Sequence, residues 1–495
     1  MPCAFQAKRP RPFHKLNPGC QFHVGEDDLT KVDGESWCDF HLHMQTQDGH
    51  LTKKGEWTEQ ERANFNKRIF EWINQAEAEE KACDLTGVVF PDSVNFKREE
   101  PYPTMCFFKA QFCSNAIFKK VQFTGTTRFD EVQFASDARF DEAQFASDAR
   151  FKNTQFSGYA WFEKTQFTGI AIFKKALFSG DISFARTRFS SYAWFENARF
   201  FSYVSFVEAE FSGDTTFAKV WFSSDTSFAR ARFLTDTSFA ESRFSGDANF
   251  QKAQFSESIK FDSDGDSSTP EAIQANVFKH INFSDSTFDG PVSFINRQFR
   301  STTSFFRCVF KKAPQFHNCT LHQGTNFDRT MFPSTFSDKA ERAEAERAYR
   351  TLKLAMEQVR ARQEESMFYA LEQTCRQGRK DVDCTVRLAS TLYLYCSDYG
   401  QSFKRPLAWL TGVTGVSWLL YALLGWSLNE EMFDFTLTQL VRPFNVWLSS
   451  NQSNLHTLFG QTKFVVKLIA TCQSLFSLSL LALFFLAPRQ NFKRG

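Results

Sequence analysis

Cysteine and histidine residues with the spacing of metal ligands lie near the amino end of this chain. The segments CQFH (20–23) and CDFH (38–41) form a C-x2-H…C-x2-H pattern with 14 residues between the two pairs. Two thiolates and two imidazoles at such spacing can complete a tetrahedral zinc site. We therefore predict a zinc site made of Cys20, His23, Cys38 and His41. Cys3 and His43 are alternative ligands, and unpaired cysteines with surface histidines remain the simpler interpretation.

Residue patterns for other chemistry are missing from the sequence. It contains no nucleophile–base set, phosphate-binding loop, H-E-x-x-H or dinucleotide fingerprint. The aspartates of DSDGD (262–266) resemble the start of a calcium loop, which needs glycine at its sixth position and glutamate at its twelfth. Ser267 and Ile273 occupy those positions, so we expect a solvated loop. We expect no enzymatic activity.

Phenylalanine dominates the long segment from about residue 85 to residue 332. The chain of 495 residues has 62 Phe against 10 Trp and 10 Tyr. From Phe112 to Phe261 they recur with gaps that alternate between six and five residues. The same spacing extends back to Leu85, although Pro101 occupies one of the positions where a Phe is expected. After an interruption, the spacing resumes over 278–332. A repeat of this kind decides the fold, so it must be interpreted first.

The rhythm indicates a β-solenoid. A small or β-branched residue lies two positions before each ring, and in an extended segment these two side chains point to the same side. Turn residues such as FSGD follow the rings of the longer units, which predicts tight corners. A helix would spread apolar positions with this spacing around all its sides, and the regular turns argue against a flat amyloid-like stack. The rings should therefore stack from coil to coil at about 4.8 Å.

The repeat units resemble those of a known family. DARFDEAQFASDARF (137–151) is similar to the A-[D/N]-[L/F]-x-x units of pentapeptide-repeat proteins, and the resemblance covers 85–332. It implies a right-handed, four-sided β-helix. Alternate units carry one extra residue, so we expect every other corner to be longer. With about 22 residues per coil, 85–261 would form about eight coils and 278–332 two to three more, at about 4.8 Å each.

Charge gives little reason to expect a nucleic-acid partner. The whole chain has a net charge of +2, and 85–332 carries 27 acidic against 28 basic residues. A neutral rod is a poor mimic of DNA and provides no basic groove for it. Regular surfaces of repeat proteins commonly bind other proteins. We therefore expect an unidentified protein partner and no nucleic acid.

The predicted domains follow from these changes in composition. Residues 1–82 form a Cys/His segment and a capping helix with Phe65, Ile69, Trp72 and Ile73 on one face. Residues 83–336 form the solenoid, with a loop insertion at 262–277. Residues 337–405 form a cytoplasmic helical stalk, within which we expect one long helix over 337–373. Residues 406–495 form a membrane domain with two spans. The fold class is thus mainly β, flanked by α-helices and ending in a transmembrane helical hairpin.

The two spans are predicted from long apolar runs at 406–428 and 464–487. Lys404 and Arg405 precede the first span and Arg489 follows the second, so the positive-inside rule places both chain ends in the cytoplasm. The location is then the inner (cytoplasmic) membrane. No export signal precedes the twelve cysteines, so free thiols are expected, including Cys375 and Cys384. A hairpin buried in a soluble partner is the alternative.

Two functions remain open from the sequence. The C-terminal module resembles a divergent two-span channel pore, with a short helix between its spans. A potassium filter needs a T-V-G-Y-G-like run, and the hairpin offers only LFGQT (458–462). The leading hypothesis is a membrane-anchored cytoplasmic scaffold that binds a protein partner. The alternative is a homo-oligomeric pore with the solenoid as its regulatory domain.

Overall fold

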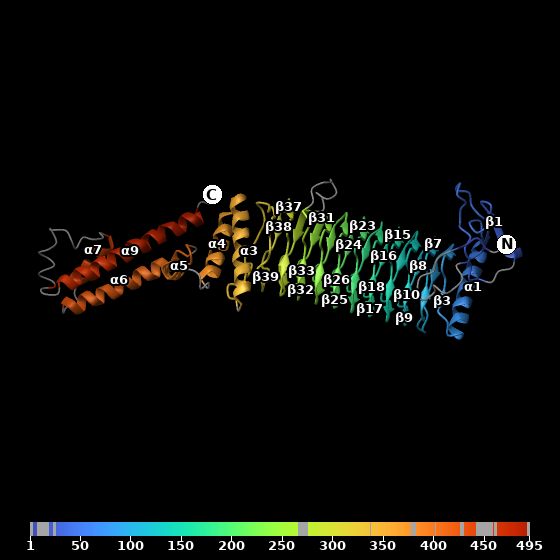
Figure 1. The fold of residues 1–495 in the computed structure, drawn as a ribbon, viewed down its shortest axis with the longest axis horizontal. Helices are drawn as coiled ribbons and strands as arrows, with labels where there is room; N and C mark the ends of the chain where they lie inside the picture. The colour runs from blue at the N-terminus through green and yellow to red at the C-terminus, as the bar shows by residue number, and fades with distance from the viewer. Residues whose placement is uncertain are drawn as a thin grey trace. The chain divides into compact units, whose positions relative to one another are not determined.

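The computed structural model describes residues 3–6, 19–22, 26–265, 276–336, 338–377, 383–400, 402–425, 430–441, 459 and 463–492. The chain divides into two compact units, Met1–Pro333 and Ser334–Gly495. Short parallel strands wind through the first unit as a four-faced solenoid (Figure 1). Equivalent strands of successive coils pair in register, as Gln133 does with Gln155, so the predicted coil length is confirmed.

Four rows of strands form the four faces. The first face is a ten-stranded sheet of β3 (Cys83–Asp84), β6 (Met105–Cys106), β10 (Thr127–Arg128), β14 (Ala149–Arg150), β18 (Ala171–Ile172), β22 (Ala193–Trp194), β26 (Thr215–Thr216), β30 (Thr237–Ser238), β33 (Ile259–Lys260) and β36 (Val292–Ser293). The second face contains β4 (Val89–Phe90), β7 (Gln111–Phe112), β11 (Gln133–Phe134), β15 (Gln155–Phe156), β19 (Leu177–Phe178), β23 (Arg199–Phe200), β27 (Trp221–Phe222) and β37 (Gln298–Phe299). The third face contains β5 (Val94–Asn95), β8 (Ala116–Ile117), β12 (Ala138–Arg139), β16 (Ala160–Trp161), β20 (Ile182–Ser183), β24 (Val204–Ser205), β28 (Thr226–Ser227) and β38 (Thr303–Ser304). β31 (Arg243–Asn249) and β34 (Val277–Asn282) continue from the second face into the third and join them into one 18-stranded sheet. The fourth face is a nine-stranded sheet of β9 (Gln122–Phe123), β13 (Gln144–Phe145), β17 (Gln166–Phe167), β21 (Arg188–Phe189), β25 (Glu210–Phe211), β29 (Arg232–Phe233), β32 (Gln254–Phe255), β35 (Thr287–Phe288) and β39 (Val309–Phe310).

Stacked phenylalanine rings fill the interior. Phe151 lies parallel to Phe173 of the next coil, with ring centroids 4.8 Å apart, and meets Phe162 of its own coil edge-on at 5.5 Å. Both arrangements are favourable for aromatic pairs and add to the large apolar area that each ring buries. The interior position that Pro101 leaves without a phenylalanine ring is also filled. Tyr102, one residue after Pro101, is buried, stacks on Phe123, and donates a hydrogen bond to the Phe96 carbonyl at 2.8 Å.

The corners alternate in type. In the shorter units the second residue after the ring has a positive φ, as at Lys109 (58°), Lys120 (60°) and every equivalent corner as far as Lys252 (60°). These positions hold charged residues or asparagine instead of glycine, although positive φ is uncommon for such residues. Charges at this position pair from coil to coil, as when Glu208 accepts from Arg186 at 2.8 Å and from Arg230 at 3.1 Å. The balanced charge of the repeats is therefore partly used in ladders of exposed ion pairs, each of small energy.

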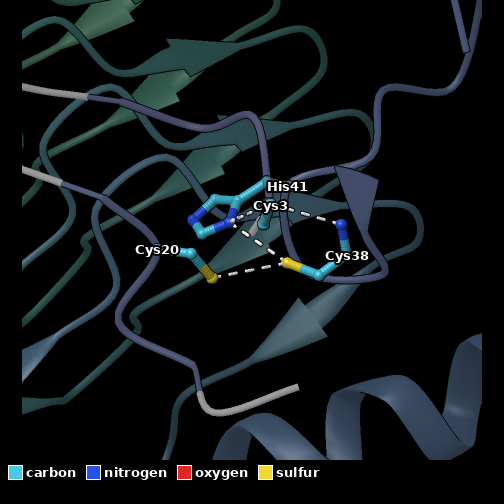
Figure 2. A group of neighbouring side chains, drawn as sticks. All are labelled: Cys3, Cys20, Cys38 and His41. Atoms are coloured by element: carbon cyan, nitrogen blue, oxygen red, sulfur yellow. Dashed lines mark hydrogen bonds between the residues drawn. The ribbon is translucent and has the colours of Figure 1, made fainter. Parts of the chain in front are cut away.

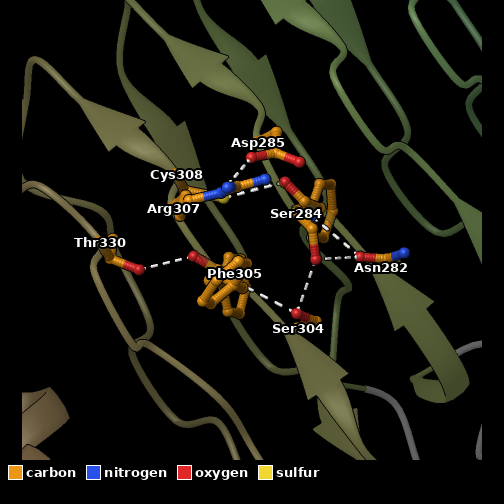
Figure 3. Close-up of polar contacts among 10 residues, drawn as sticks. Asn282, Ser284, Asp285, Ser304, Phe305, Arg307, Cys308 and Thr330 are labelled. Carbon is orange, nitrogen blue, oxygen red and sulfur yellow. Dashed lines mark hydrogen bonds and ion pairs between the residues drawn. The ribbon is translucent and has the colours of Figure 1, made fainter.

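Some polar residues that point inward donate to carbonyls of the coil before them (Figure 3), and others, such as Thr215, donate to a carbonyl two residues earlier in the chain. The buried Cys308 donates to the Phe283 carbonyl at 2.9 Å, and Thr165 donates to the Phe140 carbonyl at 2.7 Å. On the surface of the same coils, Arg307 binds Asp285 at 2.6 Å. The hydroxyl of Thr165 and the thiol of Cys308 are thus tolerated in the aromatic core because each has an acceptor within reach.

A helix and a hairpin close the amino end of the solenoid. α1 (Glu59–Ala78) starts with a capping box in which Thr58 and Glu61 bind each other's backbone amides. It buries Phe65, Ile69 and Ile73, and the Phe65 ring meets Phe90 of the first coil edge-on. The predicted capping helix therefore covers the first coil. β1 (Leu29–Val32) and β2 (Glu35–Cys38) pair antiparallel after the short helix η2 (Glu26–Asp28).

One buried arginine lies where the repeat is interrupted. The inserted loop 262–277 falls partly outside the described residues, and the register between β31 and β34 shifts at this point. Arg297, in a position that is small elsewhere in the repeat, is fully buried. Its guanidinium donates to the carbonyls of Phe261, Ser242 (3.0 Å), Phe239 (3.2 Å) and Asp262 (3.3 Å). Arg297 thus supplies donors to carbonyls of two earlier coils.

In the second unit, the prediction of one long helix over 337–373 was wrong. α3 (Lys339–Gln358) ends before Arg360, whose φ is 60°, and α4 (Arg362–Gln377) packs against it. The apolar stripe of Tyr349, Leu352 and Met356 is buried, with Tyr349 stacked on Phe368 of α4. These apolar residues are buried within one chain, so they do not require a coiled-coil partner.

Buried charges hold these two helices together. Glu372 accepts hydrogen bonds from Arg350 and Lys353, both at 2.7 Å. Burial by itself would raise the pKa of Glu372, but the hydrogen bonds from Lys353 and Arg350 outweigh it, and the pKa lies below its usual range. A carboxylate with a lowered pKa stabilises the folded state above its unfolded pKa of about 4.3, and this contribution is lost as the pH falls further.

We therefore expect Glu372→Gln to destabilise the α3–α4 pair by about 1–2 kcal/mol at neutral pH, since Arg350 is partly exposed and solvent screens it. The difference from the wild type should shrink as the pH falls below about 4. Amide hydrogen exchange of α3 and α4 at both pH values measures it. The exposed Glu357→Gln is the matched control, and an equal effect in both variants would contradict the prediction.

Two helices of the second unit are long and apolar enough to cross a membrane. They are α6 (Lys404–Gly425) and α9 (Lys463–Phe492), which follow α5 (Cys384–Ser397) and have α7 (Glu430–Val441) between them. The small polar face of α9 is buried against these neighbours. Gln473 accepts from the Tyr421 hydroxyl at 2.8 Å and donates to the Thr436 carbonyl at 3.1 Å. Ser474 donates to the Gln439 carbonyl of α7, so this face packs helices together.

Candidate functional site

The amino-terminal hairpin positions the predicted zinc ligands. Asp33 and Gly34 both have positive φ and form the tight turn between β1 and β2. Cys38 ends β2, and the turn that follows brings His41 back beside it through a hydrogen bond from the His41 amide to the Cys38 carbonyl. The Ala4 amide bonds the Ser36 carbonyl at 2.7 Å and so places the preceding residue, Cys3, against the same hairpin.

Three cysteines and one histidine meet at this point (Figure 2). The ligand atoms of Cys3, Cys20, Cys38 and His41 all lie within 4.8 Å of one another. Cys38 Sγ is 3.2 Å from His41 Nδ1 and 3.6 Å from Cys20 Sγ. Cys3 Sγ is 3.7 Å from the same Nδ1 and accepts a hydrogen bond from the Cys38 amide at 3.3 Å.

The structure thus brings together three of the four predicted ligands, Cys20, Cys38 and His41. The fourth member of the cluster is Cys3, which the sequence suggested only as an alternative. His23, the predicted fourth ligand, lies outside the described residues. His43, the other alternative, lies outside the cluster and meets the Trp37 ring edge-on. The sequence could not choose Cys3, because it lies far from Cys20 along the chain and no motif links the two.

The surroundings of the cluster orient its ligands. His41 is buried and its Nε2 lies 3.1 Å from the Thr86 carbonyl, which only accepts. Nε2 must therefore carry the proton, and the lone pair of Nδ1 points at the sulfurs. Phe5 stacks on the imidazole at 3.9 Å. Gly87, with φ of 71°, leaves room for this ring, because a Cβ there would lie 2.1 Å from Phe5.

The thiols of the cluster share protons unequally. Hydrogen bonds from Cys20 and Cys38 hold the pKa of the Cys3 thiol well below its usual range. The pKa of Cys20 is raised, chiefly because its thiol is hydrogen-bonded to Cys3. The hydrogen bond to Cys20 by itself would lower the pKa of Cys38, but its hydrogen bond to Cys3 and its burial outweigh that effect and raise the pKa to about 11. The thiolate form, which binds metal ions, is therefore favoured at Cys3 alone, and the other two thiols must release their protons when a metal binds.

A second candidate site is a groove of about 540 Å³ on the second face of the solenoid, here called the aromatic groove. It is lined by Lys175, Leu177, Asn197, Arg199, Lys219, Trp221, Glu241, Arg243 and Asp264. The Arg199 guanidinium lies over the Trp221 ring, and Phe201, 44% exposed, meets that ring edge-on at 5.9 Å. Sequence reasoning missed this groove, although Phe201 is a phenylalanine outside the repeat rhythm.

The aromatic groove carries more positive than negative charge. Four basic side chains face two acidic ones, and Lys219 pairs with Glu241 at 3.5 Å. Lys175, Arg199 and Arg243 form no ion pair with any described residue. Some basic residues elsewhere on the rod, such as Lys164 and Lys260, also form no ion pair with a described residue, so the groove is distinguished by having three such residues beside the Trp221 ring in one cavity.

Comparison with known proteins agrees with the repeat. A family model described as "Pentapeptide repeats (9 copies)" matches residues 118–166, 129–177 and 162–209. No curated protein and no solved structure matches the chain. None of these comparisons supports the resemblance of the C-terminal module to a channel pore. The matched segments together span residues 118–209 and lie within the coils whose rings and corners repeat from one coil to the next, so this part of the chain consists of pentapeptide repeats.

Proposed function

We propose that this protein is a non-enzymatic scaffold, anchored in the inner membrane by α6 and α9, whose cytoplasmic solenoid binds an acidic segment of a protein partner. The aromatic groove is the observation that carries this proposal. Its basic side chains and Trp221, with the exposed Phe201 beside them, combine the two features that partners most often use at interfaces, arginine and aromatic anchors. An extended peptide with acidic residues around an aromatic or aliphatic side chain complements it.

Charge in the aromatic groove favours a peptide over a nucleic acid. Glu241 and Asp264 lie among the basic side chains and would repel a continuous row of phosphates. A peptide can instead place its carboxylates beside Arg199 and Arg243 and leave the acidic positions uncharged. Arginine is suited to this role because its planar guanidinium binds carboxylates in a bidentate manner.

The anchor is supported by the surfaces of α6 and α9. Large apolar side chains such as Leu423, Phe464 and Leu468 are exposed on these helices, as lipid contact requires. Lys404 and Arg405 precede the apolar run of α6, so the positive-inside rule places the solenoid and both chain ends in the cytoplasm. The polar face of α9 is occupied by Tyr421 and α7, which supports an anchor more than a pore lining.

Site-specific crosslinking in cells tests the docking site. A photoreactive amino acid at position 201, beside the groove and next to Trp221, should crosslink to one recurring protein. The same probe at Arg188, exposed on the opposite fourth face, should not. The crosslinked peptide should be acidic, and a synthetic copy of it should bind the purified full chain.

Arg199→Glu should weaken that binding about tenfold or more, because a hydrogen bond to a charged group contributes about 1.5–3 kcal/mol. Arg188→Glu should leave the affinity unchanged, and salt should weaken the wild-type complex. Crosslinks to a second copy of this chain, to RNA, or equally from both faces would overturn the proposed docking site.

A further inference from the structure

We propose that Cys3, Cys20, Cys38 and His41 bind one zinc ion in a closed tetrahedral site that fastens the amino-terminal segment to the first coil of the solenoid. Three sulfur atoms and one imidazole nitrogen form a donor set that suits zinc. All four positions of a tetrahedron would be filled by the protein. The site would therefore be structural, with no open position for substrate.

The separations between the donor atoms fit a common metal centre. With Zn–S of about 2.3 Å and Zn–N of about 2.0 Å, tetrahedral ligand atoms lie about 3.5–3.8 Å apart. Cys20 Sγ and Cys38 Sγ are 3.6 Å apart, and Cys3 Sγ is 3.7 Å from His41 Nδ1. Cys38 Sγ and His41 Nδ1, at 3.2 Å, need to separate by only a few tenths of an ångström. A disulfide, in contrast, requires the sulfurs at about 2.04 Å.

Groups around the cluster provide the support that zinc ligands need. The Thr86 carbonyl fixes the protonated Nε2 of His41, as second-shell acceptors of zinc-bound histidines do. The Cys38 amide donates to Cys3 Sγ and stabilises a thiolate there. Cys38 and His41 are buried, and the Phe5 ring covers the imidazole. Water is thus kept from one side of the site.

The ion would connect segments that are distant in sequence. Cys3, Cys20 and the 38–41 turn each come from a separate stretch of chain, and Thr86 belongs to the first coil. Gln21, next to Cys20, also donates to the Asp84 and Thr86 carbonyls. A solenoid must cover its terminal coil, and zinc would hold the cover in place. Metal binding would then contribute directly to the stability of this cap.

Zinc analysis of the full chain tests the proposal. The protein is purified without a histidine tag, in detergent and under reducing conditions, and its zinc content is measured by mass spectrometry. We expect about one zinc per chain in the wild type and near zero in Cys20→Ser and in His41→Gln. The matched controls Cys113→Ser and His43→Gln, which change residues outside the cluster, should keep about one zinc. X-ray absorption should show three sulfur ligands and one nitrogen ligand.

Hydrogen exchange separates loss of metal from loss of fold. Chelation, like Cys20→Ser, should raise exchange in 29–45 and 83–90, and leave the coils over 127–260 unchanged. A metal-free wild type, zinc retained in both ligand variants, a Cys20–Cys38 disulfide in the reduced preparation, or exchange at 29–45 insensitive to chelation would each overturn the proposal.

Discussion

Replacing Phe195 by alanine should lower the local free energy of unfolding of the solenoid by about 3–5 kcal/mol, as expected for a fully buried aromatic residue. Phe195 stacks between Phe173 and Phe217 at 4.9 and 4.8 Å and meets Phe184 and Phe206 edge-on. The strands on either side pair rigidly with the adjacent coils, so the cavity cannot close easily. Truncating one ring removes contacts from all four of these neighbours.

Native-state hydrogen exchange of the full chain measures this effect where it occurs. A repeat protein is stabilised by each coil and its nearest neighbours, so amides of the coils around residue 195 should lose protection by about 100-fold or more. Coils near residue 300 should change little. Phe201→Ala, which removes a ring that is 44% exposed and outside the rhythm, should have a much smaller effect. Similar losses in the two variants would show that stacking in columns does not hold the solenoid together.

Replacing Arg297 by methionine should destabilise the coils around the interruption by about 2–5 kcal/mol, because the buried carbonyls of Phe261 and Ser242 lose their donor and each unsatisfied acceptor costs about 1–3 kcal/mol. Methionine keeps most of the length of the side chain but removes every donor. The carbonyls of Phe239 and Asp262 would also lose the guanidinium, but they keep the backbone amides of Ser242 and Glu241 as donors. Burial lowers the pKa of Arg297 to about 10, so the side chain is still charged at neutral pH.

Exchange of amides in 239–262 and 292–300 reports this loss. The matched control is Arg300→Met, because Arg300 is exposed and close to Arg297 in the chain. If the two methionine variants lose equal protection, Arg297 does not have the bridging role assigned to it. Arg297→Lys should recover only part of the loss, since one ammonium group cannot reach carbonyls of two coils at once.

Ion pairs along the solenoid explain why its net charge said little about binding. Acidic and basic residues at the positive-φ corners pair with the coil above or below, as Lys120 does with Glu142. Such pairs leave a neutral exterior with no field to attract a partner from a distance. The aromatic groove gathers three basic residues, Lys175, Arg199 and Arg243, that form no ion pair within the described part of the chain, whereas other basic residues without an ion pair, such as Lys164 and Lys252, lie outside this cavity.

The sequence by itself determined the solenoid, its coil length, the capping helix and the two apolar helices. A repeat makes this possible: each ring contacts the equivalent ring of the next coil, as Phe151 does Phe173, so one local rule applied many times specifies the contacts of the whole core. Apolar length and helical periodicity are equally local properties. At Pro101, where the repeat pattern is broken, the sequence showed that a phenylalanine is missing. It did not show that the Tyr102 ring fills the interior position in its place.

Only the tertiary structure decided the features that depend on single distant contacts. Cys3 joins Cys20, Cys38 and His41 because the Ala4 amide meets the hairpin, and no spacing in the sequence encodes that contact. Arg297 donates to the Phe239 carbonyl, which lies 58 residues earlier in the chain. α3 ends before Arg360, and the chain then turns back so that Tyr349 stacks on Phe368 of α4. Each of these contacts occurs once and is not repeated at regular intervals along the sequence. They can therefore be recognised only in the folded structure, where residues distant in sequence lie side by side.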